Sequence, residues 1–204
     1  YKRAYDGDKG PNTGSMGSYS CPDHGLPDLS KAAVHKGAEI MEETIRELSK
    51  SIGAFRGVLY GGFMETERGV FLIEYNSRFG DPEAINVLAL LGKPLIDVGW
   101  EVVDGRLTRP PFEGRATVCV YLVPEGYPTN PRKDARVEIT PPRRSELYFA
   151  SVQEVDGAIR TTSSRSIALL AKGRTVSEAR EKVYSDMPCI RGELYYRKDI
   201  GWGV

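Results

Sequence analysis

Long hydrophobic runs are missing from this sequence, and cysteine is scarce. No apolar stretch approaches the roughly 20 residues that a helix needs to cross a bilayer, and no secretory signal opens the chain. We therefore expect no membrane partner and a cytoplasmic location. The three cysteines, Cys21, Cys119 and Cys189, lie far apart and form no Cys-x-x-Cys pair. This spacing favours free thiols in a reducing compartment over disulfides or a zinc site.

An excess of one charge is also missing. The 204 residues contain 28 Lys and Arg against 28 Asp and Glu. This balance argues against a general polyanion-binding surface, so we expect no nucleic-acid partner. The length suits one large domain or two small ones, and the composition is that of a globular protein.

The stretch from Leu72 to Glu83 joins an apolar strand to a dense group of charged and amide side chains. Alternate residues of a strand share a face, so Glu74, Asn76 and Arg78 project together if the strand continues that far. A carboxylate beside an amide oxygen suits a hard cation such as Mg²⁺. A guanidinium suits phosphate, which it binds through two parallel hydrogen bonds. The alternative interpretation is a sheet edge with solvated charges.

The first part of the chain predicts a long loop. Residues 6–30 are rich in Gly, Pro, Asn, Asp and Ser, which are turn-forming residues. A loop of this length in a compact domain is either functional or disordered. Its glycines would allow backbone N–H groups to approach an anion closely. The chain has no initiator Met, and such a loop normally follows a strand, so we expect a fragment that begins inside a domain.

Hydrophobic periodicity predicts helices and strands over most of the remaining chain. We expect helices over 30–51, 81–91, 95–103 and 175–187, and strands over 57–64, 70–75, 116–123, 137–139, 147–155 and 167–172. Ser30 is the expected N-cap of the first helix, and Thr175 or Ser177 that of the last.

The composition of the sequence changes between residues 104 and 114, where an Arg-Pro-Pro run and scattered charges indicate a domain boundary. Short alternating segments follow this boundary and indicate a small, mostly β domain. The predicted fold class is therefore α+β, with one domain over residues 1–107 and a second over residues 108–204.

Two long motifs resemble those of one enzyme family. Residues 6–17, Asp-Gly-Asp-Lys-Gly-Pro-Asn-Thr-Gly-Ser-Met-Gly, are similar to the Gly-Asp-x-Gly-Pro-Asn-Thr-Gly-Gly-Met-Gly loop of phosphoribosylamine–glycine ligases, also called glycinamide ribonucleotide synthetases. Residues 73–83 resemble the Glu-Phe-Asn-x-Arg-Phe-Gly-Asp-Pro-Glu signature of that family. Shorter likenesses occur at residues 57–66, 126–128 and 196–201. The resemblance therefore runs nearly from end to end.

The resemblance implies a fold and a reaction. The family belongs to the ATP-grasp superfamily, so the first domain would be the C-terminal half of an ATP-grasp core, an antiparallel sheet with covering helices. Members join glycine to 5-phosphoribosylamine with ATP and give glycinamide ribonucleotide, ADP and phosphate, a step of purine biosynthesis. A glycyl phosphate intermediate forms when the glycine carboxylate attacks the γ-phosphate. Positioned cations matter most in such phosphoryl transfer, which agrees with the charged cluster.

The resemblance also implies roles for individual residues. Glu74 and Asn76 match the metal-ligand positions, which hold Mg²⁺ or Mn²⁺ against the phosphates of ATP. Asp8 and Arg78 match catalytic positions, with Arg78 placed for the phosphate or the acyl phosphate. The positions that match substrate-binding residues are Asn12, Thr13, Gly14, Gly80, Asp81 and Glu83.

The sequence departs from the family pattern at two places. Ser15 stands where the family has glycine, which could constrain the loop if that position needs a positive φ. Residues 163–167, Ser-Ser-Arg-Ser-Ile, replace a Gly-Gly-Arg-Val-Leu segment, and only Arg165 keeps its character.

The resemblance further implies that the N-terminal domain, the first part of the ATP-grasp core and the lid are missing. The partners would then include this missing part of the enzyme besides glycine, 5-phosphoribosylamine and ATP, and the isolated chain would be inactive. Two alternatives stay open. One is a related ATP-grasp ligase that uses a different acid or amine, and the other is a non-enzymatic fragment that packs against a partner.

Overall fold

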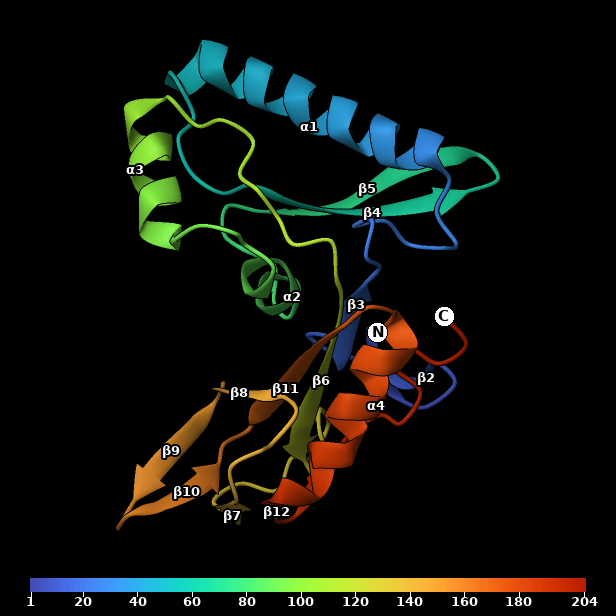
Figure 1. The fold of residues 1–204 in the computed structure, drawn as a ribbon, viewed down its shortest axis with the longest axis vertical. Helices are drawn as coiled ribbons and strands as arrows, with labels where there is room; N and C mark the ends of the chain where they lie inside the picture. The colour runs from blue at the N-terminus through green and yellow to red at the C-terminus, as the bar shows by residue number, and fades with distance from the viewer. The chain divides into compact units, whose positions relative to one another are not determined.

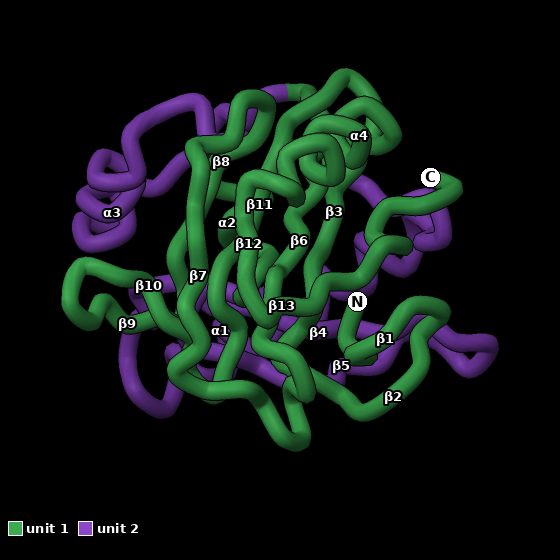
Figure 2. The backbone as a smooth tube through the Cα atoms, turned by 90° about the horizontal axis from the view of Figure 1, so that it is seen from below, with its two compact units in different colours: residues 1–24, 81–89, 114–204 green, residues 25–80, 90–113 purple.

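The computed structural model describes all 204 residues and divides them into two compact units whose segments alternate along the chain (Figure 2). Unit 1 consists of residues 1–24, 81–89 and 114–204, and unit 2 consists of residues 25–80 and 90–113. Both units combine helices with antiparallel strands, which confirms the α+β prediction (Figure 1). No helix of the chain is long and apolar enough to cross a bilayer.

The core of unit 1 is a five-stranded antiparallel sheet. Its strands are β3 (Gly17–Ser20), β6 (Ala116–Pro124), β8 (Glu146–Phe149), β11 (Ile167–Gly173) and β13 (Leu194–Tyr195). All nine residues of β6 are buried, because β11 pairs with one edge of this strand while β3 and β13 share the other. A strand buried in this way needs a nearly continuous apolar sequence. The Val, Cys, Tyr and Leu residues of β6 supply it.

Helix α4 (Val176–Asp186) covers this sheet and buries Val176, Ala179 and Val183. Thr175 is its N-cap, because the hydroxyl of Thr175 accepts a hydrogen bond from the backbone N–H of Glu178 at 3.1 Å. This assignment decides between the two predicted caps. A short 3₁₀ turn, η1 (Met187–Cys189), follows the helix.

A second antiparallel sheet of unit 1 has the strand order β12-β7-β10-β9. Its members are β7 (Arg136–Ile139), β9 (Val152–Val155), β10 (Ala158–Thr161) and β12 (Ile190–Arg191). Asp156 and Gly157 join β9 to β10 and both have positive φ, at 52° and 71°. A two-residue hairpin loop favours this conformation.

The predicted loop over residues 6–30 contains more structure than expected. Strands β1 (Arg3–Tyr5) and β2 (Lys9–Asn12) form a small hairpin, and β3 pairs with β6 from Gly17 opposite Val120 to Ser20 opposite Thr117. An added Cβ at Gly17 would collide with the carbonyl oxygen of Cys119. The glycine that suggested a loop is therefore needed for a close approach between strands.

Unit 2 consists of two helices and one hairpin. Helix α1 (Lys31–Ile52) begins after Ser30, whose hydroxyl accepts from the N–H of Ala33 at 3.0 Å, as predicted. Strands β4 (Tyr60–Thr66) and β5 (Gly69–Asn76) form the hairpin, and α1 packs on one of its faces. Helix α3 (Leu95–Asp104) ends at Gly105, which has a left-handed conformation.

The compact units do not follow the predicted division at residues 107 and 108. Residues 1–24 and 81–89 belong with residues 114–204 because β3 joins the sheet of β6, and helix α2 (Glu83–Ala89) packs against β3 and β6. The contacts divide the chain into units that are discontinuous in sequence. The predicted domain boundary stays a prediction.

Candidate functional site

The hairpin of unit 2 places Glu74 and Asn76 on the face of β5 that α1 does not cover. Tyr75 lies between them and points to α1, where its hydroxyl lies 2.5 Å from that of Thr44. Glu74 pairs with Gly62 on β4, and an added Cβ at Gly62 would lie 3.3 Å from Cγ of Glu74. The side chain of Glu74 therefore lies over Gly62, where a larger residue on β4 would press against it.

The donor atoms on this face suit a hard divalent cation. A carboxylate and an amide oxygen on alternate residues are oxygen ligands of the kind that Mg²⁺ and Mn²⁺ prefer. No group of three or more His, Cys, Asp and Glu side chains in the chain could hold a metal ion. Glu74 and Asn76 can thus supply two ligands, and further oxygen atoms would have to come from bound phosphates or water.

Arg78 and Gly80 follow the hairpin in unit 2. The guanidinium of Arg78 is exposed, and its Nη1 donates to the carbonyl oxygen of Phe79 at 2.7 Å. Gly80 is the last residue of this segment of unit 2. Unit 2 therefore holds four of the predicted site residues.

The other predicted residues lie in unit 1, and one of them, Thr13, stabilises its own loop. Thr13 donates its hydroxyl hydrogen to the carbonyl oxygen of Lys2 at 2.9 Å, and its oxygen accepts from the N–H of Ser15 at 3.0 Å. Asn12 is the exposed last residue of β2 and pairs with Arg3. Thr13 thus stabilises the loop, while the amide of Asn12 faces solvent.

Gly14 contacts Arg165, which was not among the predicted site residues. Nη1 of Arg165 donates to the carbonyl oxygens of Gly14 and Ser15 at 2.7 and 3.1 Å. An added Cβ at Gly14 would lie 3.1 Å from the guanidinium, so glycine permits this close approach. The likeness of residues 163–167 to a family segment that keeps its arginine was the signal that could have identified Arg165.

Arg165 also binds Asp81, which lies two residues before α2. Its Nη2 forms an ion pair with Oδ2 of Asp81 at 2.8 Å, and its Cζ lies 4.5 Å from the ring centre of Tyr121. The hydroxyl of Tyr121 donates to Oδ1 of Asp81 at 2.7 Å. Burial and this carboxylate raise the pKa of Tyr121 above its ordinary value, so its hydroxyl remains a donor. Asp81 therefore fixes Arg165 and Tyr121, and Glu83 begins α2 two residues later.

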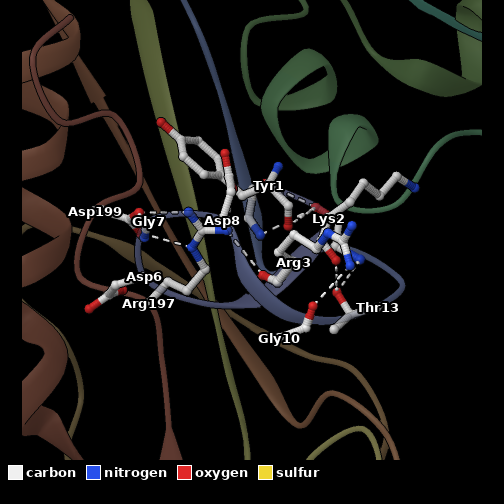
Figure 3. A network of polar contacts seen from close by, with 12 residues as sticks. Tyr1, Lys2, Arg3, Asp6, Gly7, Asp8, Gly10, Thr13, Arg197 and Asp199 are labelled. Carbon is white, nitrogen blue, oxygen red and sulfur yellow. Dashed lines mark hydrogen bonds and ion pairs between the residues drawn. The ribbon is translucent and has the colours of Figure 1, made fainter.

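Asp8 lies in the turn between β1 and β2, where Arg197 holds it (Figure 3). Nη1 of Arg197 donates to Oδ1 of Asp8 at 2.8 Å and to the carbonyl oxygen of Arg3 at 3.0 Å. Nε and Nη2 of Arg197 bind both oxygens of Asp199 at 2.8 and 2.6 Å. Residues 196–201 resemble a segment of the family, but their sequence alone predicts no role for Arg197 or Asp199.

The charges of this network reinforce one another. Burial alone would lower the pKa of Arg197, but the hydrogen bonds to Asp199 and Asp8 outweigh burial and raise that pKa above its ordinary value. Burial opposes the ionisation of Asp199, yet hydrogen bonds from Arg197 and from the N–H of Gly7 hold its pKa at about 2. Arg197 and Asp199 are therefore both charged at neutral pH.

Two family models match the chain. The model described as the ATP-grasp (A) domain of phosphoribosylglycinamide synthetase matches residues 1–84, and the C domain of the same family matches residues 117–203. Among curated proteins, the phosphoribosylamine–glycine ligase of Methanosarcina barkeri is 43% identical over 204 residues, covering 98% of this chain and 47% of that protein.

A comparison with solved structures also finds the phosphoribosylamine–glycine ligases. The crystal structure of phosphoribosylamine–glycine ligase from Thermotoga maritima has a TM-score of 0.85 at 33% identity, covering 98% of this chain and 50% of that chain. The biotin carboxylase domain of Hydrogenobacter thermophilus 2-oxoglutarate carboxylase, in complex with MgADP, has a TM-score of 0.55 at 15% identity over 82% of this chain and 38% of that chain. The second likeness shows the fold alone. The chain spans about half the length of the curated relatives it matches.

Proposed function

Because this chain belongs to the phosphoribosylglycinamide synthetase family, we propose that it forms part of an ATP-dependent ligase that joins glycine to 5-phosphoribosylamine. The observation that carries the proposal is the placement of Glu74 and Asn76 on the uncovered face of β5, beside the bare backbone of Gly62. Since the chain spans about half the length of its relatives, the proposal concerns the enzyme that contains these residues.

Glu74 and Asn76 would bind Mg²⁺ or Mn²⁺ through their side-chain oxygens. A bound divalent cation neutralises negative charge on the phosphates of ATP and helps to align them. Two protein ligands leave coordination positions for phosphate oxygens, which Mg²⁺ commonly takes from a nucleotide. Arg78, two residues beyond Asn76, would donate its remaining N–H groups to the transferred phosphoryl group.

The proposed reaction has two steps. A carboxylate oxygen of glycine attacks the γ-phosphorus of ATP, the bond to the β,γ-bridging oxygen breaks, and ADP leaves. The amine of 5-phosphoribosylamine then attacks the acyl carbon of glycyl phosphate, loses a proton and expels inorganic phosphate. The products are glycinamide ribonucleotide, ADP and phosphate. We place this purine-pathway reaction in the cytoplasm.

The residues of unit 1 would act on the substrate side. Asp8 and Asn12 present a carboxylate and an amide on the β1–β2 hairpin, where they could accept hydrogen bonds from an amine or a hydroxyl group. Gly14 offers a backbone without a side chain. Asp81 and Glu83 would shape the same pocket, although Asp81 already binds Arg165 and Tyr121.

A substrate screen on the full-length enzyme tests the proposal. ADP release should depend on glycine, and glycinamide ribonucleotide should form only when 5-phosphoribosylamine is also present. Alanine, serine and bicarbonate serve as alternative acids in parallel reactions. A strong preference for an acid other than glycine would identify a different ATP-grasp ligase, and the proposed substrate would be wrong.

A further inference from the structure

Arg197 is the largest side chain in the chain that is fully buried, with an exposed fraction of 0%. A buried guanidinium is costly unless partners neutralise it and take up its hydrogen bonds. Asp199 already meets this need, because its two oxygens bind Nε and Nη2 in a paired geometry. Asp8 is therefore a second carboxylate on one cation, beyond what charge balance requires.

The two carboxylates differ in exposure. The side chain of Asp8 is 72% exposed, whereas that of Asp199 is 28% exposed. Only Oδ1 of Asp8 binds Arg197. Arg197 thus holds the carboxylate of Asp8, which otherwise faces solvent, in one orientation. A charged side chain on a surface turn would ordinarily lose this orientation, since exposed ion pairs are weak.

The segment that carries Arg197 holds the rest of the turn as well. The N–H of Lys198 donates to Oδ1 of Asp6 at 2.7 Å, and the N–H of Gly7 donates to Oδ2 of Asp199 at 2.8 Å. Gly7 and Asp8 both have positive φ, at 70° and 53°. A non-glycine residue keeps this conformation only where its surroundings impose it. Figure 3 shows Arg197 with its two carboxylate partners, Asp8 and Asp199.

We propose that Arg197 is a positioning residue, which fixes the carboxylate of Asp8 and the hairpin of residues 3–12 in the arrangement that contacts substrate. This role rests on the proposed function, because it assumes that Asp8 and Asn12 contact a substrate. It assigns a task to the C-terminal segment of residues 196–201, which binds the β1–β2 hairpin through several hydrogen bonds.

Kinetics of Arg197→Lys and Arg197→Ala in the full-length enzyme test the proposal. A lysine ammonium cannot reach Asp8 and Asp199 with the fork geometry of a guanidinium. We expect the KM for glycine or for 5-phosphoribosylamine to rise about tenfold or more, while the KM for MgATP changes by less than about twofold. Guanidinium ion at millimolar concentration should partly restore the lower KM in Arg197→Ala.

Arg180 provides the matched control. Its guanidinium lies over the rings of Tyr184 and Trp202, at 4.4 and 4.7 Å, and Nη2 donates to the carbonyl oxygen of Lys198 at 2.6 Å. Arg180 therefore supports the same C-terminal segment without touching the β1–β2 hairpin. Arg180→Met should lower the thermal unfolding temperature and leave all three KM values within about twofold of the wild type.

The outcomes separate the two proposals. If the wild-type enzyme shows no glycine-dependent ADP release, the proposed function is wrong, and the positioning role is wrong with it. If the wild type is active but Arg197→Lys changes the three KM values equally, or changes none, Arg197 supports only the fold. The same conclusion follows if Arg180→Met reproduces the kinetics of Arg197→Lys, or if added guanidinium restores nothing.

Discussion

At the scale of the residue, Ser15 shows how one side chain can depart from a family pattern and still fit. It has φ of 94° and is almost completely buried. This backbone conformation favours glycine, which is the residue of the family loop. The hydroxyl of Ser15 donates to the carbonyl oxygen of Gly17 at 3.0 Å. A buried hydrogen bond thus offsets part of the cost of the conformation.

Substitutions at Ser15 test this explanation. Ser15→Ala keeps the Cβ and loses the hydrogen bond, so it should lower the free energy of unfolding by about 1–2 kcal/mol. Ser15→Gly also loses the bond but relieves the backbone, so it should be the more stable of the two. Thermal unfolding of the full-length enzyme provides the comparison.

Ser18 is the matched control for Ser15. It lies in β3 with ordinary extended backbone, where glycine is normally less stable than alanine by about 0.5–1 kcal/mol. Ser18→Gly should therefore be less stable than Ser18→Ala, the reverse of the order at Ser15. The same order at both positions would contradict the backbone argument.

Single residues also mark where sequence analysis stops. The sequence indicated that residue 15 could need a positive φ, because the family has glycine at this position. The contacts of Arg165 and Arg197 with the loop of residues 3–15 were not predicted, since the family likeness of residues 163–167 and 196–201 does not say which loop they bind. Such pairings, 151 residues apart for Arg165 and Gly14, depend on how the sheets bring segments together.

At the scale of the element, periodicity and capping predicted the strongest features well. Helices α1 and α4 begin at predicted caps, and the hairpin of β4 and β5 has the predicted order of strands. The register of β4 against β5 shifts between Gly62 and Phe63, and this bulge was not predicted. The strand segments on either side of a bulge keep their own alternation of side chains, so the sequence pattern does not reveal it.

Short strands were harder to predict. The segment 147–155 was expected to be one strand, but the structure divides it into β8 and β9, which belong to different sheets. β10 was missed. Strands of four residues carry little periodic signal, and their pairing partners decide whether they form.

The N-cap of α4 gives a prediction at this scale. Thr175→Ala removes the hydroxyl that accepts from the N–H of Glu178 and should lower the free energy of unfolding by about 1 kcal/mol. Ser177→Ala serves as control, because Ser177 is exposed within the first turn and the cap is Thr175. Urea unfolding of the two variants should differ by most of this amount. Equal stabilities would mean that the cap contributes nothing.

At the scale of the whole molecule, the predicted fold class and family likeness are confirmed, whereas the compact units were not foreseen. A change in composition near residues 104–114 suggested a single domain boundary in the chain. The contacts instead join the first 24 residues to the C-terminal sheet through β3. Composition reports local sequence, and β-pairing across about a hundred residues leaves no local trace.

The proposed metal ligands, Glu74 and Asn76, both lie on the hairpin of unit 2. Glu74→Gln keeps the size of the side chain and removes the charge that would hold a divalent cation. Glu67→Gln is the matched control, because Glu67 lies in the turn at the other end of the same hairpin. Both variants should keep the wild-type unfolding temperature within a few degrees, since both side chains are exposed.

Glycine-dependent ADP release by the full-length enzyme, measured at rising Mg²⁺ concentrations, tests whether Glu74 helps to bind the cation. Glu74→Gln should lower kcat about 100-fold or more and require higher Mg²⁺, while Glu67→Gln keeps the wild-type curve. Wild-type turnover and Mg²⁺ dependence in Glu74→Gln would contradict the account.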